Sequence, residues 1–223
     1  MPAHAHKGDI GPSGIFRADL PRAYQSVDRH SPAGSEGLSI PTMTVLQQHC
    51  GFWDRDNDGR IYPLDTYLGC RELGMSMALS LGFMWLLHFT LLVPYMTQDN
   101  WILHPYLCIY LKNIHRIKHA SDSGVYDEEG RMYPAKLEQI WSTLGAEELR
   151  SYDDVKRLVW ANKDVGDFIG WLASFISWSL LWLVARDERG VVSREALRCC
   201  YDGTLFYHIA ERRRARAMES KYE

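Results

Sequence analysis

Asp54–Asp65 reads DRDNDGRIYPLD, the most informative stretch of the chain for its local fold. Its acids stand at alternate positions, Asp54, Asp56 and Asp58, and Gly59 follows them directly. Calcium prefers six to eight oxygen ligands, so three alternating carboxylates supply a large part of its shell, and glycine permits the sharp turn that the loop needs at this point. The spacing therefore predicts the calcium loop of an EF-hand.

The remaining loop positions fit this prediction with one departure. Position 7 contributes only its backbone carbonyl, so Arg60 is acceptable there, and Ile61 at position 8 is the apolar residue that pairs with a partner loop. Position 12 holds Asp65 in place of the usual glutamate, and this shorter side chain should lower calcium affinity and let magnesium compete better. The expected ligand set is Asp54, Asp56, Asp58, Arg60 and Asp65. Apolar residues at helical spacing predict helices before and after the loop.

Two segments further along the chain are partly similar in sequence to the calcium loop. DEEGRMYP at Asp127–Pro134 repeats DNDGRIYP at Asp56–Pro63, and RDERGVVSRE at residues 186–195 places Gly190 at the turn position. Both lack the first and last ligands, so we expect neither to hold a metal. We expect the last loop to pair with the true calcium loop as a degenerate structural partner, through its apolar Val192.

Three apolar runs without charge occupy residues 73–98, 100–111 and 168–185. The first run is long enough to cross or enter a bilayer, and we expect it to form one long helix in or tilted through a lipid interface. The alternative, a hairpin made by the first two runs, would place Asp99 at its deepest point, where an ionised carboxylate is costly. The third run carries three tryptophans and is typical either of a buried core helix or of an interfacial helix.

Composition narrows the classes of function. The 223 residues are 46% hydrophobic with a formal net charge of -3, which allows a sizeable core but gives no broad basic surface for nucleic acid. Five cysteines without a C-x-x-C pair predict neither a disulfide framework nor a zinc ribbon. The N-terminus lacks the apolar segment of a secretory signal, so we expect a cytosolic start. Residues 1–40 have the composition of a disordered tail, and residues 211–223 form a charged tail, either a solvated helix end or a patch for anionic lipid headgroups.

Histidines supply the remaining candidate ligands. His49 lies on the helix that enters the calcium loop, and His115 and His119 are four residues apart, which predicts that they share one helical face. By itself this pair is a weak metal signal, because no third ligand is obvious. His88 and His104 are more typical of hydrogen-bonded interior or interfacial residues.

Four segments of the chain resemble the caleosins, a family also called peroxygenases. They follow one another in the order of the family: LQQHCGFWDRDNDGRIYPLDTYLGCRELG at residues 46–74, IHRIKHASDSGVYDEEGRMYP at 114–134, GWLAS at 170–174 and LVARDERGVVSREALRCCYDGTLF at 183–206. Separate motifs in one order are far more specific than an EF-hand alone.

The resemblance implies a protein of the lipid droplet or endoplasmic reticulum membrane that faces the cytosol and binds one calcium ion and haem b. The family's two axial haem ligands match His49 and His119, with His115 as a substitute candidate. The implied catalytic reaction is peroxygenation, an oxylipin-forming step in which a fatty-acid hydroperoxide gives one oxygen to an unsaturated fatty acid. The implied partners are membrane lipids and these substrates, and no nucleic acid is among them. The resemblance leaves open whether the protein forms a homo-oligomer.

Two departures from the plant pattern lead us to expect a non-plant, fungal-type member. Only Pro94 and Pro105 remain of the proline-rich knot that plant caleosins carry after the apolar segment. Phe175 and Ser177 stand where charged residues are common, which makes this region more apolar.

The predicted fold is mainly α, an EF-hand helix-loop-helix with a degenerate partner loop plus a long apolar membrane-associated helix. The expected regions are a tail (1–40), the EF-hand (41–73), an apolar lipid-associated segment (74–111), a C-terminal helical region with the second haem histidine and the degenerate loop (112–210) and the charged tail (211–223). A calcium-dependent haem peroxygenase at a lipid surface is the leading hypothesis. Its alternatives are a non-enzymatic coat or sorting protein of lipid droplets and a calcium buffer or sensor with a peptide-binding groove.

Overall fold

The calcium-loop segment folds into a helix, a loop and a helix. The structure is a computed structural model that describes residues 25–35, 43–90 and 92–220. Helix α1 (Val45–Gly51) begins with a capping box, in which the side chains of Thr44 and Gln47 each accept a hydrogen bond from the other residue's backbone N–H. Helix α2 (Pro63–Glu72) begins with a proline, whose fixed φ suits the first helical position.

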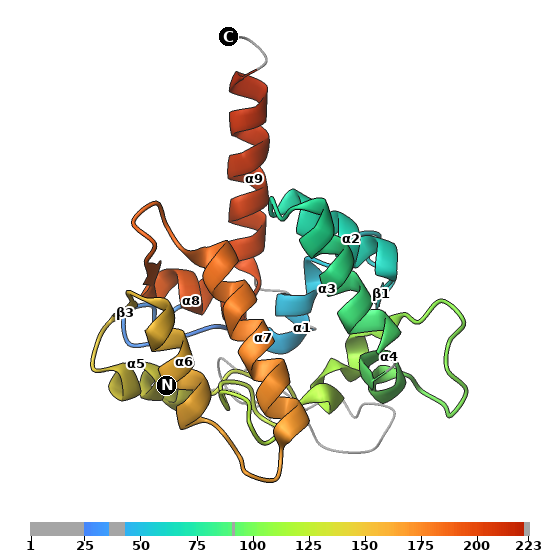
Figure 1. Ribbon diagram of the computed structural model, residues 1–223, viewed down its shortest axis with the longest axis horizontal. Coiled ribbons are helices and arrows are strands. Elements are labelled where there is room, and N and C mark those ends of the chain that lie inside the picture. The colour runs from blue at the N-terminus through green and yellow to red at the C-terminus, as the bar shows by residue number, and fades with distance from the viewer. Residues whose placement is uncertain (1–24, 36–42, 91, 221–223) are drawn as a thin grey trace, which may run out of the picture.

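The described residues form a mainly helical protein, which confirms the mainly α part of the expected fold (Figure 1). In the N-terminal half the elements are α1, β1 (Arg60–Ile61), α2, α3 (Met77–Phe89), α4 (Leu92–Thr97), β2 (Ile109–Tyr110) and the 3-10 helix η1 (Leu111–Ile117). In the C-terminal half they are α5 (Pro134–Leu144), β3 (Glu148–Leu149), α6 (Tyr152–Ala161), α7 (Phe168–Ala185), β4 (Val192–Ser193), α8 (Arg194–Tyr201) and α9 (Thr204–Glu219).

Two short antiparallel strand pairs stabilise the loops. β1 pairs with β2, with Ile61 opposite Ile109, and β3 pairs with β4, with Leu149 opposite Val192. The expected pairing of the loop at Val192 with the calcium loop is therefore wrong. Each loop strand instead finds its own extended partner segment, and all four of these apolar side chains are buried. The partner of Ile61 lies within the second apolar run, where a short strand was not expected.

The first apolar run does not form the expected single long helix. Gly74 adopts φ 86°, which ends α2 with a left-handed turn, and the Ser76 side chain caps the start of α3 by accepting from the N–H of Leu79. A second break separates α3 from α4, which begins at Leu92. Local turn and cap residues thus divide a run whose apolar composition by itself suggests one span.

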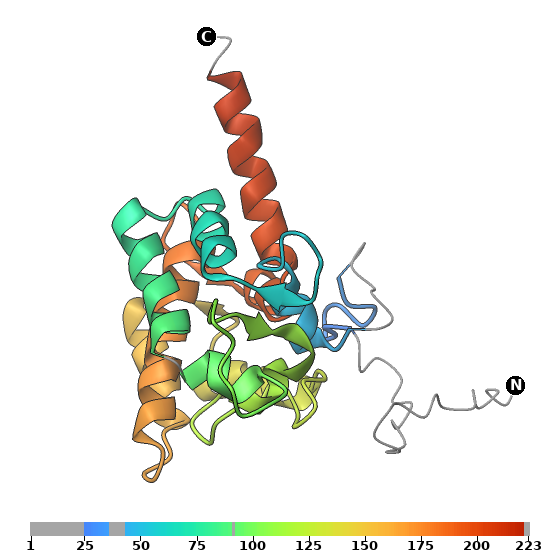
Figure 2. The ribbon, with the colours of Figure 1, turned by 90° about the vertical axis from the view of Figure 1, so that its right-hand side faces the viewer.

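Among the described residues, α7 is the one helix that is long and apolar enough to cross a membrane, by length and composition. Its buried residues recur at every fourth position: Gly170, Ser174, Trp178 and Trp182. This spacing places them in one stripe, so α7 packs on the body through one face and is not a fully buried core helix. α3 and α7 lie on the same face of the molecule, seen from the front in Figure 1 and along the left edge in Figure 2.

The largest core lies in the C-terminal half, between α5, α6, α7 and α8. It includes fully buried side chains such as Leu137, Leu149, Leu158 and Leu197. A smaller core beside the calcium loop joins Leu46, Ile61, Ile109, Leu111 and Ile114. The buried contacts of α9 end at Ala210. Beyond it Arg214 forms an ion pair of 3.0 Å with Glu72 of α2, and the end of the helix projects from the body (Figure 2).

The described N-terminal segment, residues 25–35, packs against α8. Ser26, Val27 and Asp28 are buried, and Asp28 forms an ion pair of 2.9 Å with Arg194. This corrects the expected disordered tail for these residues, because a buried ion pair and buried backbone contacts fix the segment to the body. Residues 1–24, which belong to the same expected tail, lie outside the described residues.

Candidate functional site

Three acids of the calcium loop converge on one point. The carboxylates of Asp54, Asp56 and Asp58 offer oxygen atoms that all lie within 4.8 Å of one another. Asp54 is buried and accepts hydrogen bonds from the N–H groups of Asp58 (3.2 Å) and Gly59 (2.9 Å), which shapes the turn around it. Burial raises the pKa of Asp54, and the neighbouring charges of Asp58 and Asp56 raise it further. A divalent cation at this point would offset the mutual repulsion of the three acids.

The other two predicted ligands lie apart from this cluster. Oδ2 of Asp65 accepts the backbone N–H of Tyr62 at 2.9 Å, so this carboxylate caps α2 and is not among the converging acids. Arg60 lies in β1, and its guanidinium stands 5.2 Å from the centre of the Tyr110 ring. The converging part of the predicted set is therefore Asp54, Asp56 and Asp58, and the roles of Asp65 and of the Arg60 carbonyl stay predictions.

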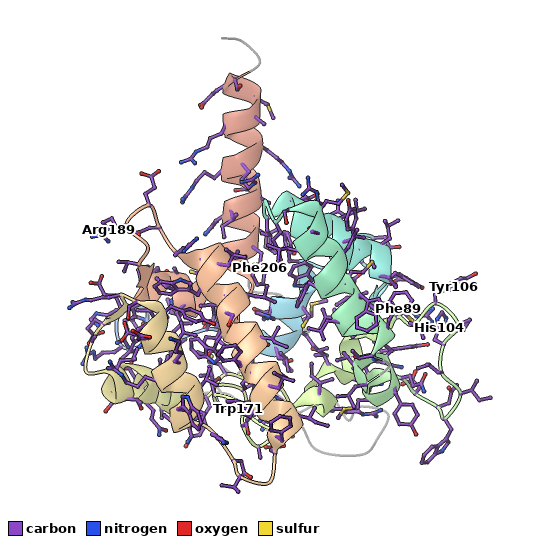
Figure 3. All side chains as sticks on the ribbon, in the orientation of Figure 1. Phe89, His104, Tyr106, Trp171, Arg189 and Phe206 are labelled. Atoms are coloured by element: carbon purple, nitrogen blue, oxygen red, sulfur yellow. The ribbon has the colours of Figure 1, made fainter. Side chains whose placement is uncertain are left out.

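An apolar cavity of about 370 Å³ lies beside the calcium loop. Its walls come from α1, α3, α7, α8 and the base of α9, and they include Phe83, Leu87, Trp178, Leu181 and Phe206. Figure 3 shows Phe206 near the base of α9, behind the upper part of α7. The polar lining includes two imidazoles, His49 and His119, with Lys118 and Asp122 near the second one in the sequence. Such a mostly apolar cavity with few polar groups is typical of a small-molecule site.

A hydrogen bond fixes His49 in the tautomer that a metal ligand needs. Its Nδ1 lies 2.6 Å from the carbonyl oxygen of Cys200, and because a carbonyl only accepts, Nδ1 carries the proton. Burial lowers the pKa of His49, although the bond to Cys200 opposes this shift, so the ring is neutral with its lone pair on Nε2. The ring also packs edge-on against Phe206, with the ring centres 5.2 Å apart.

His119 lies at the same cavity but belongs to no helix. It follows η1, which ends at Ile117, so the expected common helical face for His115 and His119 is wrong. Nδ1 of His119 is buried and lies 3.2 Å from Oδ2 of Asp167, although the two atoms are not aligned as a hydrogen bond. His115 is half-buried and is not part of the cavity lining, which leaves it without a role as the substitute ligand here.

His88 and His104 make hydrogen bonds, as expected from the sequence. His88 is fully buried, and its two ring nitrogens lie 2.8 Å from the Thr66 hydroxyl oxygen and 2.8 Å from the Leu107 carbonyl oxygen. His104 is half-buried in a loop, and its Nδ1 accepts the backbone N–H of Tyr106 at 3.3 Å. Neither lines the cavity.

Three contacts of the site were missed from the sequence. A backbone carbonyl, that of Cys200, orients His49, and no side-chain pattern signals it. Gly203 packs directly on α1, where an added Cβ would lie 2.6 Å from the Gln48 carbonyl oxygen and 3.0 Å from Cα of His49. Asp167 did carry a signal, since it stands immediately before an apolar helical run, but that position indicates only a helix cap.

The residues at the cavity fit a haem group. Two imidazoles from distant parts of the chain line one apolar space, and the Nδ1 of each lies close to an oxygen acceptor, which leaves Nε2 for a metal. Lys118 adds a cation to the lining, suited to a carboxylate of a cofactor or a fatty acid.

Comparison with known proteins agrees with the motifs. A family model described as "Caleosin related protein" matches residues 41–210. A "Peroxygenase" of Lilium longiflorum is 39% identical over 199 residues, which cover 87% of this chain and 82% of the relative. "Probable peroxygenase 4" of Arabidopsis thaliana is 34% identical over 170 residues, which cover 75% of this chain and 86% of the relative.

A further relative is only partly similar. It is a "Probable inactive peroxygenase-like protein" of Arabidopsis thaliana, 32% identical over 99 residues, which cover 44% of this chain and 48% of the relative. No solved structure matches the chain. These relatives are plant proteins, so the expected fungal-type origin stays a prediction. The family match extends over most of the chain and includes the calcium loop, His49 and His119: the chain belongs to the caleosin family.

Proposed function

We propose that this caleosin is a calcium-dependent haem peroxygenase that transfers oxygen from a fatty-acid hydroperoxide to an unsaturated lipid at a lipid-droplet or endoplasmic reticulum surface. The peroxygenase names of two relatives that match most of the chain support the reaction class. The observation that carries the proposal is the meeting of His49 and His119, which are far apart in the sequence, at one apolar cavity.

The residues of the cavity have distinct roles in this proposal. Haem, when bound, supplies the redox chemistry that uses the peroxide as oxidant. His49 and His119 would hold it through Nε2, since the Nδ1 of each lies close to an oxygen acceptor. The apolar walls accommodate acyl chains and exclude water. Nζ of Lys118 lies 3.3 Å from the exposed Glu128 and 3.9 Å from Asp122, and a fatty-acid carboxylate would compete with these partners for its charge.

Calcium dependence follows from the position of His49 on α1, the helix that enters the calcium loop. Trp53, next to Asp54, lines the cavity and packs against Phe206 with ring centres 5.7 Å apart, and Phe206 also touches His49. Because the calcium loop, Trp53 and His49 are packed together, calcium binding at Asp54 would alter the orientation of the His49 ring.

The lipid partner is supported by the exposed apolar side chains of α3 and α7, which flank the cavity. On α3 these include Met77, Leu81, Trp85 and Phe89, and on α7 Phe168, Ile169, Leu172 and Leu183. Both helices also contribute to the cavity lining, so a lipid surface on this face would bring acyl chains to the cavity. Figure 3 shows Phe89 on α3 and Trp171 at the lower end of α7.

The test is an absorption spectrum of the purified protein with added haemin, with and without calcium, followed by a fatty-acid hydroperoxide assay on the same samples. We expect His49→Ala and His119→Ala to lose the Soret band of the bound haem. His115→Ala is the matched control and should keep it, because His115 does not line the cavity. Absence of haem uptake by the wild-type protein would overturn the proposal.

A non-enzymatic role at lipid droplets is the second candidate, favoured by the relative that is called inactive. In that case His49 and His119 serve as hydrogen-bonded core residues. Vesicle binding without any haem uptake, in protein made with ample haem, would support this role over the enzyme.

A further inference from the structure

The side chain of Asp167 contacts two parts of the chain, the start of α7 and the segment around His119. It is the N-cap of α7, where its Oδ1 accepts the N–H of Gly170 at 2.9 Å. Its Oδ2 accepts the N–H of Ser121 at 2.9 Å and lies 3.2 Å from Nδ1 of His119. The carboxylate therefore lies between the start of α7 and the segment that carries His119.

The segment around His119 is fixed to α7 by further hydrogen bonds. Ser121 is fully buried, its hydroxyl donates to the Asp167 carbonyl oxygen at 3.2 Å, and its own carbonyl accepts from the Ser174 hydroxyl at 2.7 Å. These contacts set the position of Asp167 relative to His119 before any ligand enters. Nδ1 of His119 is buried and has no aligned hydrogen bond, so the nearby carboxylate is available to it as an acceptor after a small rotation of the ring.

Gly170 leaves room for this pair. A Cβ at position 170 would lie 2.1 Å from Oδ2 of Asp167 and 2.4 Å from Nδ1 of His119, closer than any side chain tolerates. Glycine inside a helix is unfavourable because of its backbone entropy, so its presence here requires a local reason. The close approach of the carboxylate and the imidazole to the helix backbone provides that reason.

We propose that Asp167 is the positioning residue of His119, accepting a hydrogen bond from Nδ1–H so that Nε2 faces the cavity, where it would bind the haem. The inference rests on the proposed function, because it assigns His119 to the same cofactor. A carboxylate behind a metal-bound imidazole sets its tautomer, fixes the ring plane and makes the imidazole a stronger donor. It also connects α7, the apolar helix of the lipid-facing side, directly to one axial ligand.

The first test compares haem binding by Asp167→Asn with that by the wild-type protein. Asparagine remains a good N-cap, so α7 should persist, while the charged acceptor is lost. We expect haem affinity to fall by about 10- to 100-fold and the reduction potential of bound haem to become more positive, because the ferric state loses a stabilising negative charge. Gly170→Ala, which separates the pair without removing the charge, should lower haem affinity in the same way.

The matched control is Asp164→Asn, which removes the same charge three positions earlier. Asp164 bonds only to the N–H of Gly166 through its side chain (2.8 Å) and does not contact His119, so haem affinity and potential should match those of the wild type. Equal affinity and equal potential for Asp167→Asn and the wild type would overturn the assignment.

A second measurement needs no haem and separates this inference from the proposed function. The nitrogen NMR shifts of His119 in the haem-free protein report its tautomer, which should be Nδ1–H in the wild type and mixed in Asp167→Asn. An Nε2–H tautomer in the wild type overturns the role of Asp167 whether or not haem binds. If the wild type shows the Nδ1–H tautomer but takes up no haem, the proposed function is overturned. The hydrogen bond between His119 and Asp167 is then retained without a role in haem binding.

Discussion

Two effects destabilise the ionised form of the Asp54 carboxylate, burial and the charge of its neighbours, and a bound metal ion would offset both. The carboxylate is 5% exposed, and it stands beside two further acids whose oxygens converge with its own. Burial and like charges both raise its pKa, so they disfavour the ionised form that calcium requires. The backbone N–H groups of Asp58 and Gly59 offset part of this cost. Calcium affinity should therefore fall on acidification at a higher pH than that at which an exposed aspartate is protonated.

Asp54→Asn should weaken calcium binding by roughly 10- to 100-fold, because the site loses one of its three converging charges. Isothermal titration calorimetry on the intact protein measures this directly. Asp187→Asn is the control, since Asp187 shapes the degenerate loop by accepting from the N–H groups of Arg189 and Val191 but belongs to no such cluster. Equal calcium affinity in Asp54→Asn and the wild type would contradict the assignment of the loop.

Gly203→Ala should disturb His49 through the backbone of α1. Gly203 adopts φ 81°, and its added methyl would press on the backbone of Gln48 and His49. We expect a loss of about 1–3 kcal/mol in the free energy of unfolding, measured in urea, together with weaker haem binding. Gly145→Ala is the control, because Gly145 also has a positive φ (65°) but an added Cβ there meets no atom within 4 Å. It should cost only the backbone strain of about 1–2 kcal/mol and leave haem binding unchanged.

At the scale of elements, α8 connects the N-terminal segment to the cavity. Arg194 at its start is bound by Asp28 of that segment and by Glu138 and Glu147, while the Cys200 carbonyl near its end holds His49. Burial alone would raise the pKa of Asp28, but the hydrogen bonds from Arg194 and from two backbone N–H groups bring it below its ordinary value of 3.8. The segment is therefore held by an ionised carboxylate.

Asp28→Asn should lower the free energy of unfolding by about 1–3 kcal/mol at neutral pH, less than for an isolated buried pair because Arg194 keeps Glu138 and Glu147. Because the folded-state pKa is lowered, this stabilisation is fully present above about pH 3.8 and is lost as the pH falls through the lowered pKa. Urea unfolding and hydrogen exchange of residues 25–35 across this range provide the measurement.

The comparison variant for Asp28→Asn is Arg29→Ala, whose ion pair with Glu147 is largely exposed. It should change the unfolding free energy by less than about 1 kcal/mol. If the two variants were equally stable, the ion pair between Asp28 and Arg194 would not be what holds the segment.

In the whole molecule α3 and α7 lie on one face, and α9 projects from the body (Figure 2). The helices of this face expose apolar side chains, and α9 carries Arg212, Arg213, Arg214 and Arg216. Side chains such as Trp85 and Leu172 are exposed on this face. The cavity lies beneath the same two helices. A lipid surface is thus the partner that best covers the face and supplies acyl chains, in keeping with the lipid association that membership in the caleosin family implies.

Trp85→Glu should reduce binding to phospholipid vesicles at least about tenfold, since an aromatic side chain at the interface is replaced by a charge. Vesicle co-sedimentation measures the effect, and circular dichroism checks that the fold persists. Leu64→Glu changes a residue of similar exposure at the start of α2, outside α3 and α7, and should bind vesicles like the wild type. Unchanged binding by Trp85→Glu would exclude this face as the lipid contact.

The calcium loop and its flanking helices were predictable from the sequence because everything that shapes them is local. The alternating acids, Gly59 and the cap at Thr44 lie within a few residues of the backbone that they organise. The same locality explains the failure in the first apolar run, where composition suggested one span but Gly74 and Ser76 already contained the signal for a break.

Only the tertiary structure decided which distant groups meet. Ile61 pairs with Ile109 rather than with Val192, His49 is oriented by the carbonyl of Cys200, and His119 lies beside Asp167. From the sequence alone came the alternating acids Asp54, Asp56 and Asp58, whose oxygens converge in the structure, and the mainly helical class of the protein. A buried imidazole or strand, however, takes as partner whichever backbone or carboxylate the packed chain brings within reach, and that choice is recorded in no local pattern of residues.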